Sequence, residues 1–305
     1  HGKRARQGSC TTEGIARLMS ARHQLHLKLA PWALLSVSAA WGFAFVVMKD
    51  AIERQTVNNF LFSRFVLAVV VMILIRPQCL KYFNKDLLVR ASTAGLFLGA
   101  GYILQTLGLK LTGAAITGFI TGLYVVFTPL IAAVVLKARI TLITWGCVGI
   151  ATLGLALLSL QGWSIGFGEL LVLGSAFAFG AHIIALGKWS SGRDAYAMTV
   201  VQLAMCALLT GLASLFEGGY QLPPDDGVWA TVIFTAVVCT AVAFVIQTWS
   251  QAHMSTTKVA VILTMEVVFA ALFAIVFGGE TLTLQKALGG VLVVIAMFVI
   301  VLKEA

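Results

Sequence analysis

Three ionisable side chains lie deep within long apolar runs of this sequence: Arg64, His182 and Glu266. A charge in hydrocarbon costs several kcal/mol, so each of them must face protein or water. Glu266 is a candidate proton carrier or ligand for a cationic group, and the alternative is a neutral, hydrogen-bonded carboxyl that fixes helix packing. Arg64 is a candidate ligand for a substrate carboxylate, and the alternative is pairing with a helix C-terminus or with Glu266. His182 is a candidate proton relay, or a histidine satisfied within a helix bundle.

Further polar and aromatic residues in the same runs predict a pocket with stacking faces and amide groups. Trp41 lies in the middle of its run, which is atypical for a tryptophan of the membrane interface. Pro129 cannot donate a hydrogen bond to the carbonyl of Val125, so we expect a kinked or loosened helix and treat Pro129 as a candidate hinge. The predicted set is Trp41, Gln105, Tyr124, Gln202, Gln247 and Trp249.

The sequence offers little support for catalytic chemistry. It contains no His-x-x-x-His pair, no Gly-x-Ser-x-Gly and no phosphate-binding loop with lysine, which are signatures of metal, acyl-transfer and nucleotide chemistry. Its five cysteines form no Cys-x-x-Cys pair and predict neither a disulfide framework nor a zinc site. We therefore expect no enzyme activity, no cofactor, no metal and no direct coupling to ATP.

The composition indicates a membrane protein. Of the 305 residues, 60% are hydrophobic and 11% are charged, whereas soluble domains carry roughly 25% charged residues. The formal net charge is +9, but the basic residues lie singly or in small groups between apolar runs. They form no basic stripe with interleaved aromatic residues, so a nucleic-acid partner is not expected.

Ten apolar runs are long enough to cross a hydrocarbon layer of about 30 Å. They predict an all-α polytopic membrane protein with ten transmembrane helices. Residues 1–28 are polar and basic, and we expect a disordered cytoplasmic tail there rather than a targeting peptide. The predicted spans are 32–48, 57–75, 89–107, 114–135, 142–160, 169–187, 196–216, 228–249, 257–277 and 284–302.

The distribution of lysine and arginine predicts the orientation. With the N-terminus inside the cell, sixteen basic residues fall in inner segments and four, Lys49, Arg54, Lys110 and Lys286, in outer ones. Basic residues favour the cytoplasmic side of a membrane. We therefore expect a protein of the cell membrane with both termini in the cytoplasm.

The chain contains an internal repeat. Gln105-Thr106 matches Gln247-Thr248 at an offset of 142, and residues 125–127 match residues 267–269 at the same offset. In the earlier spans, residues 40–43 lie over 176–179 at an offset of 136, and Arg64 lies over Gln202 at 138. The repeated units are 32–160 and 168–302, each with five spans. Because five is odd, the second unit enters the membrane from the opposite side, which makes the repeat inverted.

An inverted repeat predicts function as well as fold. Two similar halves can exchange conformations, which gives outward-facing and inward-facing states of similar energy, as alternating access requires. We therefore predict a secondary transporter for a small solute. A duplicated bundle kept for stability, a channel or lipid-flipping protein, and a membrane-embedded enzyme are the alternatives.

Several motifs in both halves resemble one known family. MEVVFAALF (265–273), GETLT (279–283), Gln285 and Gly289 are similar to the second repeat of the EamA family, within the drug/metabolite transporter superfamily, and Arg64-Phe65 and TGLYVVFTPL (121–130) are similar to its first repeat. The resemblance covers essentially all of 32–302. It implies a ten-helix bundle whose cavity is lined by the first four helices of each half. It also implies carriage, usually export, of an amino acid, a drug or a related amphipathic solute. The family commonly has proline where this chain has Val267.

Overall fold

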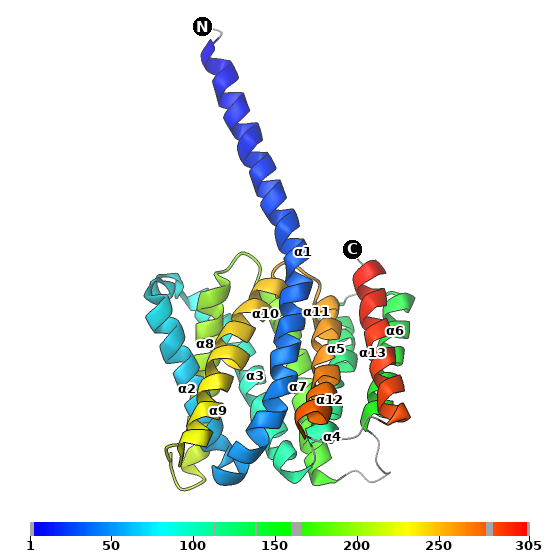
Figure 1. Cartoon of the computed structure of the whole chain (residues 1–305). Coiled ribbons are helices and arrows are strands. Elements are labelled where there is room, and N and C mark those ends of the chain that lie inside the picture. The colour runs from blue at the N-terminus through cyan, green and yellow to red at the C-terminus, as the bar shows by residue number, and fades with distance from the viewer. Residues whose placement is uncertain (1–2, 113, 138, 160–165, 279–282, 304–305) are drawn as a thin grey trace.

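The structure, a computed structural model, describes residues 3–112, 114–137, 139–159, 166–278 and 283–303. Every regular element in these ranges is a helix, and Figure 1 shows them packed side by side in one bundle. Residues 279–282, which include most of the GETLT motif, lie outside the described ranges. The all-helical prediction is confirmed for the part of the chain described.

Each predicted span falls on one helix or on helices that follow one another directly. Seven segments of the described chain are long and apolar enough to cross a membrane, and shorter apolar helices cover 120–135, 142–154 and 287–296. The elements are α1 (Lys3–Arg54), α2 (Val57–Ile75), η1 (Pro77–Tyr82), α3 (Lys85–Leu111), α4 (Ala114–Gly122), α5 (Tyr124–Val135), α6 (Leu142–Ser159), α7 (Phe167–Trp189), α8 (Ala195–Leu215), α9 (Asp226–Ala236), η2 (Val237–Val242), α10 (Ala243–Gln251), α11 (Thr256–Leu263), α12 (Met265–Gly278) and α13 (Leu284–Lys303).

The N-terminal segment differs from its prediction. The sequence predicts a disordered tail over residues 1–28, whereas α1 begins at Lys3 and continues without interruption into the first span. Figure 1 shows this part of α1 projecting from the bundle as a single helix. Alanine, arginine, leucine and glutamine, which favour helix, are frequent in this segment. The cytoplasmic location of this tail stays a prediction.

Two predicted spans are broken within one residue of corresponding places. In the fourth span, Leu123 separates α4 from α5, and its carbonyl accepts a short-range hydrogen bond from the amide of Val126. In the ninth span, Thr264 separates α11 from α12, and its carbonyl accepts from the amide of Val267. Such i to i+3 bonds tighten a helix locally. The same irregularity in both halves supports the internal repeat.

Helices α2 and α8, the second spans of the two halves, lie antiparallel. At one end Arg76, which follows α2, forms an ion pair of 2.9 Å with Asp194, the residue that caps the start of α8. At the other end Asn58, near the start of α2, donates a hydrogen bond of 2.7 Å to Glu217, which follows α8. The hydrogen bonds that Arg76 donates to Asp194 raise the pKa of its guanidinium. Equivalent helices of the two halves therefore run in opposite directions.

The contacts of two glycines define how the first spans of the halves match. A β-carbon on Gly42 would lie 2.7 Å from the amide nitrogen of Ala270 and 2.8 Å from Cβ of Phe269. A β-carbon on Gly180 would lie 3.1 Å from Cβ of Phe127 and 3.4 Å from the amide nitrogen of Thr128. Thr128 and Ala270, like Phe127 and Phe269, are 142 residues apart, so Gly42 corresponds to Gly180.

The offset of the first spans is therefore 138, and the sequence-based offset of 136 is wrong. The error arose because alternating small and aromatic residues match almost equally well after a slip of two positions. The corrected offset agrees with that of Arg64 and Gln202. It makes Phe179 the counterpart of Trp41.

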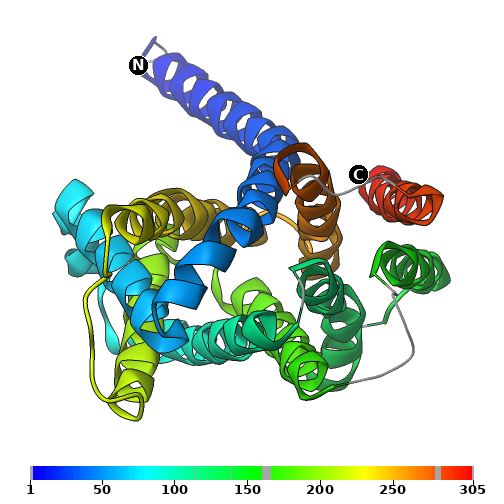
Figure 2. The same cartoon turned by 60° about the horizontal axis from the view of Figure 1, so that its bottom comes forward.

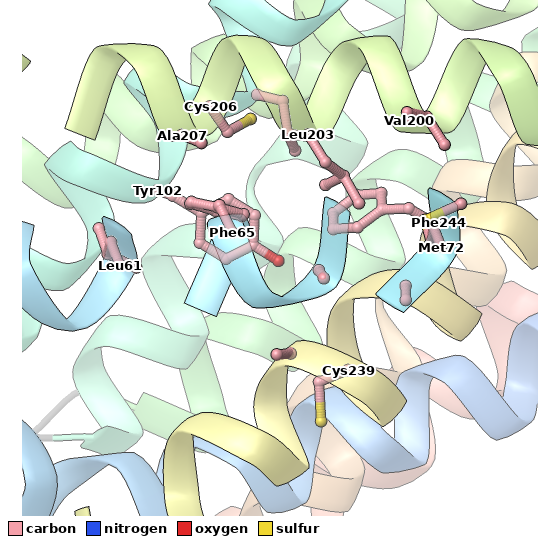
Figure 3. Packing of buried hydrophobic residues seen from close by; sticks show 14 of the residues in the cluster. Leu61, Phe65, Met72, Tyr102, Val200, Leu203, Cys206, Ala207, Cys239 and Phe244 are labelled. Atoms are coloured by element: carbon pink, nitrogen blue, oxygen red, sulfur yellow. The ribbon is translucent and has the colours of Figure 1, made fainter. Parts of the chain in front are cut away.

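Buried apolar side chains fill the bundle around its centre. One cluster packs between α2, α3, α8 and η2 and contains Phe65, Tyr102, Leu203 and Cys239 (Figure 3). Helices α6 and α13, the fifth spans of the two halves, contact each other, and Figures 1 and 2 show this pair at one edge of the bundle. The centre of the bundle is therefore surrounded by the first four spans of each half.

Candidate functional site

A cavity lies at the centre of the bundle. The space open to the centre of a water-sized sphere is about 50 Å³, which is room for a few water molecules. Its walls come from the first four spans of the first half and from the first, third and fourth spans of the second. The lining residues are Trp41, Ala44, Phe45, Met48, Arg64, Leu98, Tyr102, Gln105, Thr121, Tyr124, Phe179, His182, Ile183, Phe244, Gln247, Leu263 and Glu266.

The structure brings seven of the nine predicted cavity residues together in this lining. They are Trp41, Arg64, Gln105, Tyr124, His182, Gln247 and Glu266. Gln202 lies directly behind the wall, with its Oε1 2.8 Å from Nε2 of His182. Trp249 is not among the lining residues and packs against His253, with ring centroids 5.2 Å apart. The role of these side chains in substrate binding stays a prediction.

Four aromatic lining residues were not predicted from the sequence: Phe45, Tyr102, Phe179 and Phe244. The Tyr102 ring lies 5.4 Å from that of Phe179 and 6.1 Å from that of Phe244, both nearly perpendicular to it. In the sequence these residues are typical of an apolar core. The repeat leads to one of them, because Phe179 corresponds to the predicted residue Trp41 at the offset of 138.

Most of the lining consists of repeat-related pairs. Seven pairs account for fourteen of the seventeen lining residues, so the cavity lies where the two halves meet about their pseudo-symmetry axis. At an offset of 142 the pairs are Tyr102 with Phe244, Gln105 with Gln247, Thr121 with Leu263, and Tyr124 with Glu266, and at 138 they are Trp41 with Phe179, Ala44 with His182, and Phe45 with Ile183. The ionisable groups break the symmetry. Glu266 has Tyr124 as its counterpart in the first half, and Arg64 has Gln202 as its counterpart in the second.

Arg64 is buried, with 2% of its surface exposed, and its partners are neutral. Its Nε donates to Oγ1 of Thr240 at 2.6 Å. Its Nη2 lies 3.4 Å from both the Tyr102 hydroxyl and the Cys239 carbonyl, and the guanidinium stands 4.8 Å from the centre of the Tyr102 ring. Among the described residues it forms no ion pair with Glu266 or with any other carboxylate. An ion pair with Glu266, one of the two pairings that the sequence left open, is therefore not found among the described residues.

A wide helical turn places the acceptors for Arg64. The π-helix η2 contains both Cys239 and Thr240, and π-helical turns displace backbone groups from the regular hydrogen-bond ladder. The Cys239 carbonyl also accepts a hydrogen bond of 2.7 Å from Nε1 of Trp41. One irregular turn in the eighth span therefore fixes both Trp41 and Arg64 at the cavity wall.

Glu266 lies in the first turn of α12 with 8% of its surface exposed. No hydrogen bond to its carboxyl is found within the described ranges. Two neutral oxygens of the lining, the Tyr124 hydroxyl and Oε1 of Gln247, are likewise buried without a partner. Besides the carboxyl, this side of the cavity therefore offers a hydroxyl that can donate or accept and an amide oxygen that can accept.

His182 and Gln105 are held by other polar side chains. The hydrogen bond between His182 and Gln202 favours a histidine satisfied within the bundle over a proton relay. Nε2 of Gln105 donates to Oγ1 of Thr121 at 3.1 Å. Both side chains thus have fixed orientations at the wall.

Pro129, the candidate hinge, is buried in α5. Like any proline it has no N–H to donate to the carbonyl of Val125. One residue earlier, Oγ1 of Thr128 donates to the carbonyl of Tyr124 at 2.7 Å, and the break at Leu123 lies less than two turns away. The half-helix that begins with Tyr124 therefore follows directly on a break and lacks one regular hydrogen bond at Pro129.

We expect Pro129→Ala to slow transport by restoring the missing hydrogen bond and stiffening α5. The maximal rate should fall several-fold while the solute concentration at half-maximal rate stays within about twofold, because a hinge affects interconversion rather than contacts with the solute. Initial rates over a range of solute concentrations measure both quantities. A changed half-saturation with an unchanged maximal rate would assign Pro129 to the binding wall instead.

Comparison with known proteins agrees with this geometry. The sequence profile of the EamA-like transporter family matches the chain twice, over residues 28–160 and 166–302. An uncharacterized transporter from Archaeoglobus fulgidus is 30% identical over 292 residues, which cover 95% of this chain and 88% of the relative. A crystal structure with 18% sequence identity superposes with a TM-score of 0.71, covering 90% of this chain and 96% of the other, and so shows the same fold. On this evidence the chain belongs to the EamA-like transporter family.

Proposed function

We propose that the protein is a secondary transporter that carries a small organic solute across the cell membrane, in the direction of export. The central cavity opens alternately to the two sides as the halves exchange conformations. The observation that carries this proposal is the lining of the cavity, in which fourteen of seventeen residues are repeat-related pairs. A solute site on a pseudo-symmetry axis is equally accessible from either side once the halves exchange shapes.

The proposed architecture is ten transmembrane helices in two inverted five-helix repeats. The antiparallel arrangement of α2 and α8, with Arg76–Asp194 at one end and Asn58–Glu217 at the other, supports the inversion. Basic residues favour the cytoplasm for both termini. In the proposed orientation, Arg54 and its ion-pair partner Asp225 lie on the outer side.

Glu266 is proposed to couple transport to protons. It is the one carboxyl among the lining residues, and within the described ranges no basic side chain pairs with it. A carboxyl at the cavity wall can load a proton from one side and release it to the other as access alternates. Uptake of the solute would then be opposed, and export driven, by an inward proton gradient.

Counterflow in proteoliposomes tests the proposed function. Vesicles containing the purified protein are loaded with unlabelled solute and diluted into a trace of labelled solute. A carrier accumulates the label transiently and saturates with external concentration. A channel, or a protein that flips lipids, gives equilibration without trans-stimulation, and that result would reject the proposal. Candidate solutes come from a growth-protection screen of amino acids and drugs in cells that overproduce the protein.

A further inference from the structure

We propose that Arg64 is the anchor for a carboxylate, and that the transported solute is therefore a small organic carboxylate. This inference rests on the proposed transport function and names the chemical class of the solute. It assigns the anionic group of the solute to the wall between α1, α2 and α3. The apolar part of the solute then lies against the aromatic rings of the cavity.

The first observation is a buried positive charge without an ion-pair partner. Arg64 is 2% exposed, and its hydrogen-bond acceptors are a hydroxyl, a carbonyl, a phenol and a thioether. Glu266 lines the same cavity and interacts electrostatically with this charge, but no carboxylate of the described residues forms an ion pair with it. A buried charge without a direct partner is costly. A bound anion in contact with the guanidinium would supply that partner.

The second observation is a free hydrogen-bonding edge. The Nη1 atom of Arg64 has a single contact, the sulfur of Met48 at 3.6 Å, and a thioether is a weak acceptor. Arg64 and Met48 both line the cavity. A guanidinium edge presents N–H donors in the fork geometry that matches a carboxylate. Nη1 therefore has one unused N–H and one that meets only a thioether, and a carboxylate could accept hydrogen bonds from this nitrogen.

The remaining lining favours a carboxylate over a phosphate. Among the described residues that line the cavity, Arg64 is the only arginine or lysine, whereas a dianionic phosphate is normally held by several donors or by more than one cation. Trp41, Phe179 and Phe244 provide flat apolar walls on the same cavity. Such walls suit a short aliphatic or aromatic body attached to the carboxylate.

Binding of matched ligand pairs to the purified protein tests this inference. The pairs are acetate with acetamide, 3-phenylpropionate with its amide, leucine with leucinamide, and phenylalanine with phenylalaninamide, measured by thermal stabilisation and tryptophan fluorescence. We expect at least one carboxylate to bind about tenfold or more tightly than its amide, as loss of a hydrogen bond to a charged group would give. The amino-acid pairs and the simple acids distinguish a zwitterion from an anion. Equal binding of carboxylate and amide in every pair, or no binding of any carboxylate, overturns the inference.

Three variants then locate the anchor. Arg64→Gln, which copies the counterpart Gln202, should lose about tenfold or more in affinity for the preferred carboxylate and retain the affinity for its amide. Arg64→Lys should restore part of the loss, because it keeps the charge but not the fork. Arg139→Gln removes an exposed positive charge outside the cavity and should bind as the wild type does. Unchanged carboxylate preference in a folded Arg64→Gln protein refutes the anchor, and the wild-type ligand pairs decide the question if that variant does not fold.

Counterflow with the same ligands separates this inference from the transport proposal. A carboxylate that binds in an Arg64-dependent way but is never exchanged would refute transport and leave the subsite standing. Exchange of a solute that lacks an anionic group would refute the subsite and leave transport standing. Exchange of the preferred carboxylate supports both.

Discussion

Glu266→Gln is expected to abolish the dependence of transport on a pH gradient while exchange of the solute continues. Glutamine keeps the shape and one carbonyl of the side chain but carries no exchangeable acid proton. Glu266 lies at the cavity wall in the first turn of α12, and the described lining contains no second carboxyl. Loss of this single group should therefore uncouple the proton from the solute.

The measurement compares solute accumulation in proteoliposomes with and without an imposed pH gradient. In the variant, accumulation with the gradient should fall to the level seen without it, and counterflow at equal pH should persist. Tyr124→Phe is the matched control, because it removes a polar atom from the equivalent position of the first half and should leave gradient dependence intact. Persistent gradient dependence in Glu266→Gln would show that protons are carried elsewhere or not at all.

Gly42→Ala is expected to lower the stability of the bundle. The added carbon would lie 2.7 Å from the amide nitrogen of Ala270 and 2.8 Å from the carbonyl oxygen of Glu266. Both are backbone atoms of α12, so the clash cannot be relieved by rotation of a side chain. Overpacking typically costs about 1–3 kcal/mol. Displacement of α12 would also move Glu266, so transport should fall as well.

Two matched glycines calibrate this result. Gly180→Ala, at the equivalent position of the second half, meets its nearest atom at 3.1 Å and should be clearly less damaging. Gly149→Ala has no heavy atom within 4 Å and should leave stability unchanged or slightly raised, since alanine favours helix. The fraction of soluble monodisperse protein after heating in detergent measures all three. Equal stability of the three variants would contradict the tight contact of α1 with α12.

The sequence predicted the helical segments well because each span is an uninterrupted apolar run bounded by polar or basic residues. It also predicted seven of the lining residues, since a polar or ionisable group inside such a run must face protein or water. The aromatic lining residues Phe179 and Phe244 were not predicted, because the same residue types fill the apolar core. Once the offset of 138 is known, the repeat relates Phe179 to the predicted residue Trp41, whereas Phe244 corresponds to Tyr102, which was not predicted either.

The partner of Arg64 was beyond sequence-based prediction. The contact depends on the π-helix η2, Val237–Val242, which is part of a longer apolar run. This segment contains no proline or glycine that would indicate an irregular helix. The choice of offset in the first spans failed for a related reason, because alternating small and aromatic residues match in more than one register. Only the contacts of Gly42 and Gly180 distinguish 138 from 136.

The proposed alternating access requires the two halves to be inverted about a shared cavity. Chemical labelling of equivalent positions in the two halves tests this inversion most directly. Glu53 and Ser191 are exposed and related by the offset of 138. Each is replaced singly by cysteine in a protein whose five native cysteines have been removed, and whole cells are treated with a membrane-impermeant thiol reagent. We expect the cysteine at position 53 to react in intact cells and the cysteine at position 191 to react only after the membrane is permeabilised. Labelling of both positions from the same side would contradict the inverted repeat and the alternating access that follows from it.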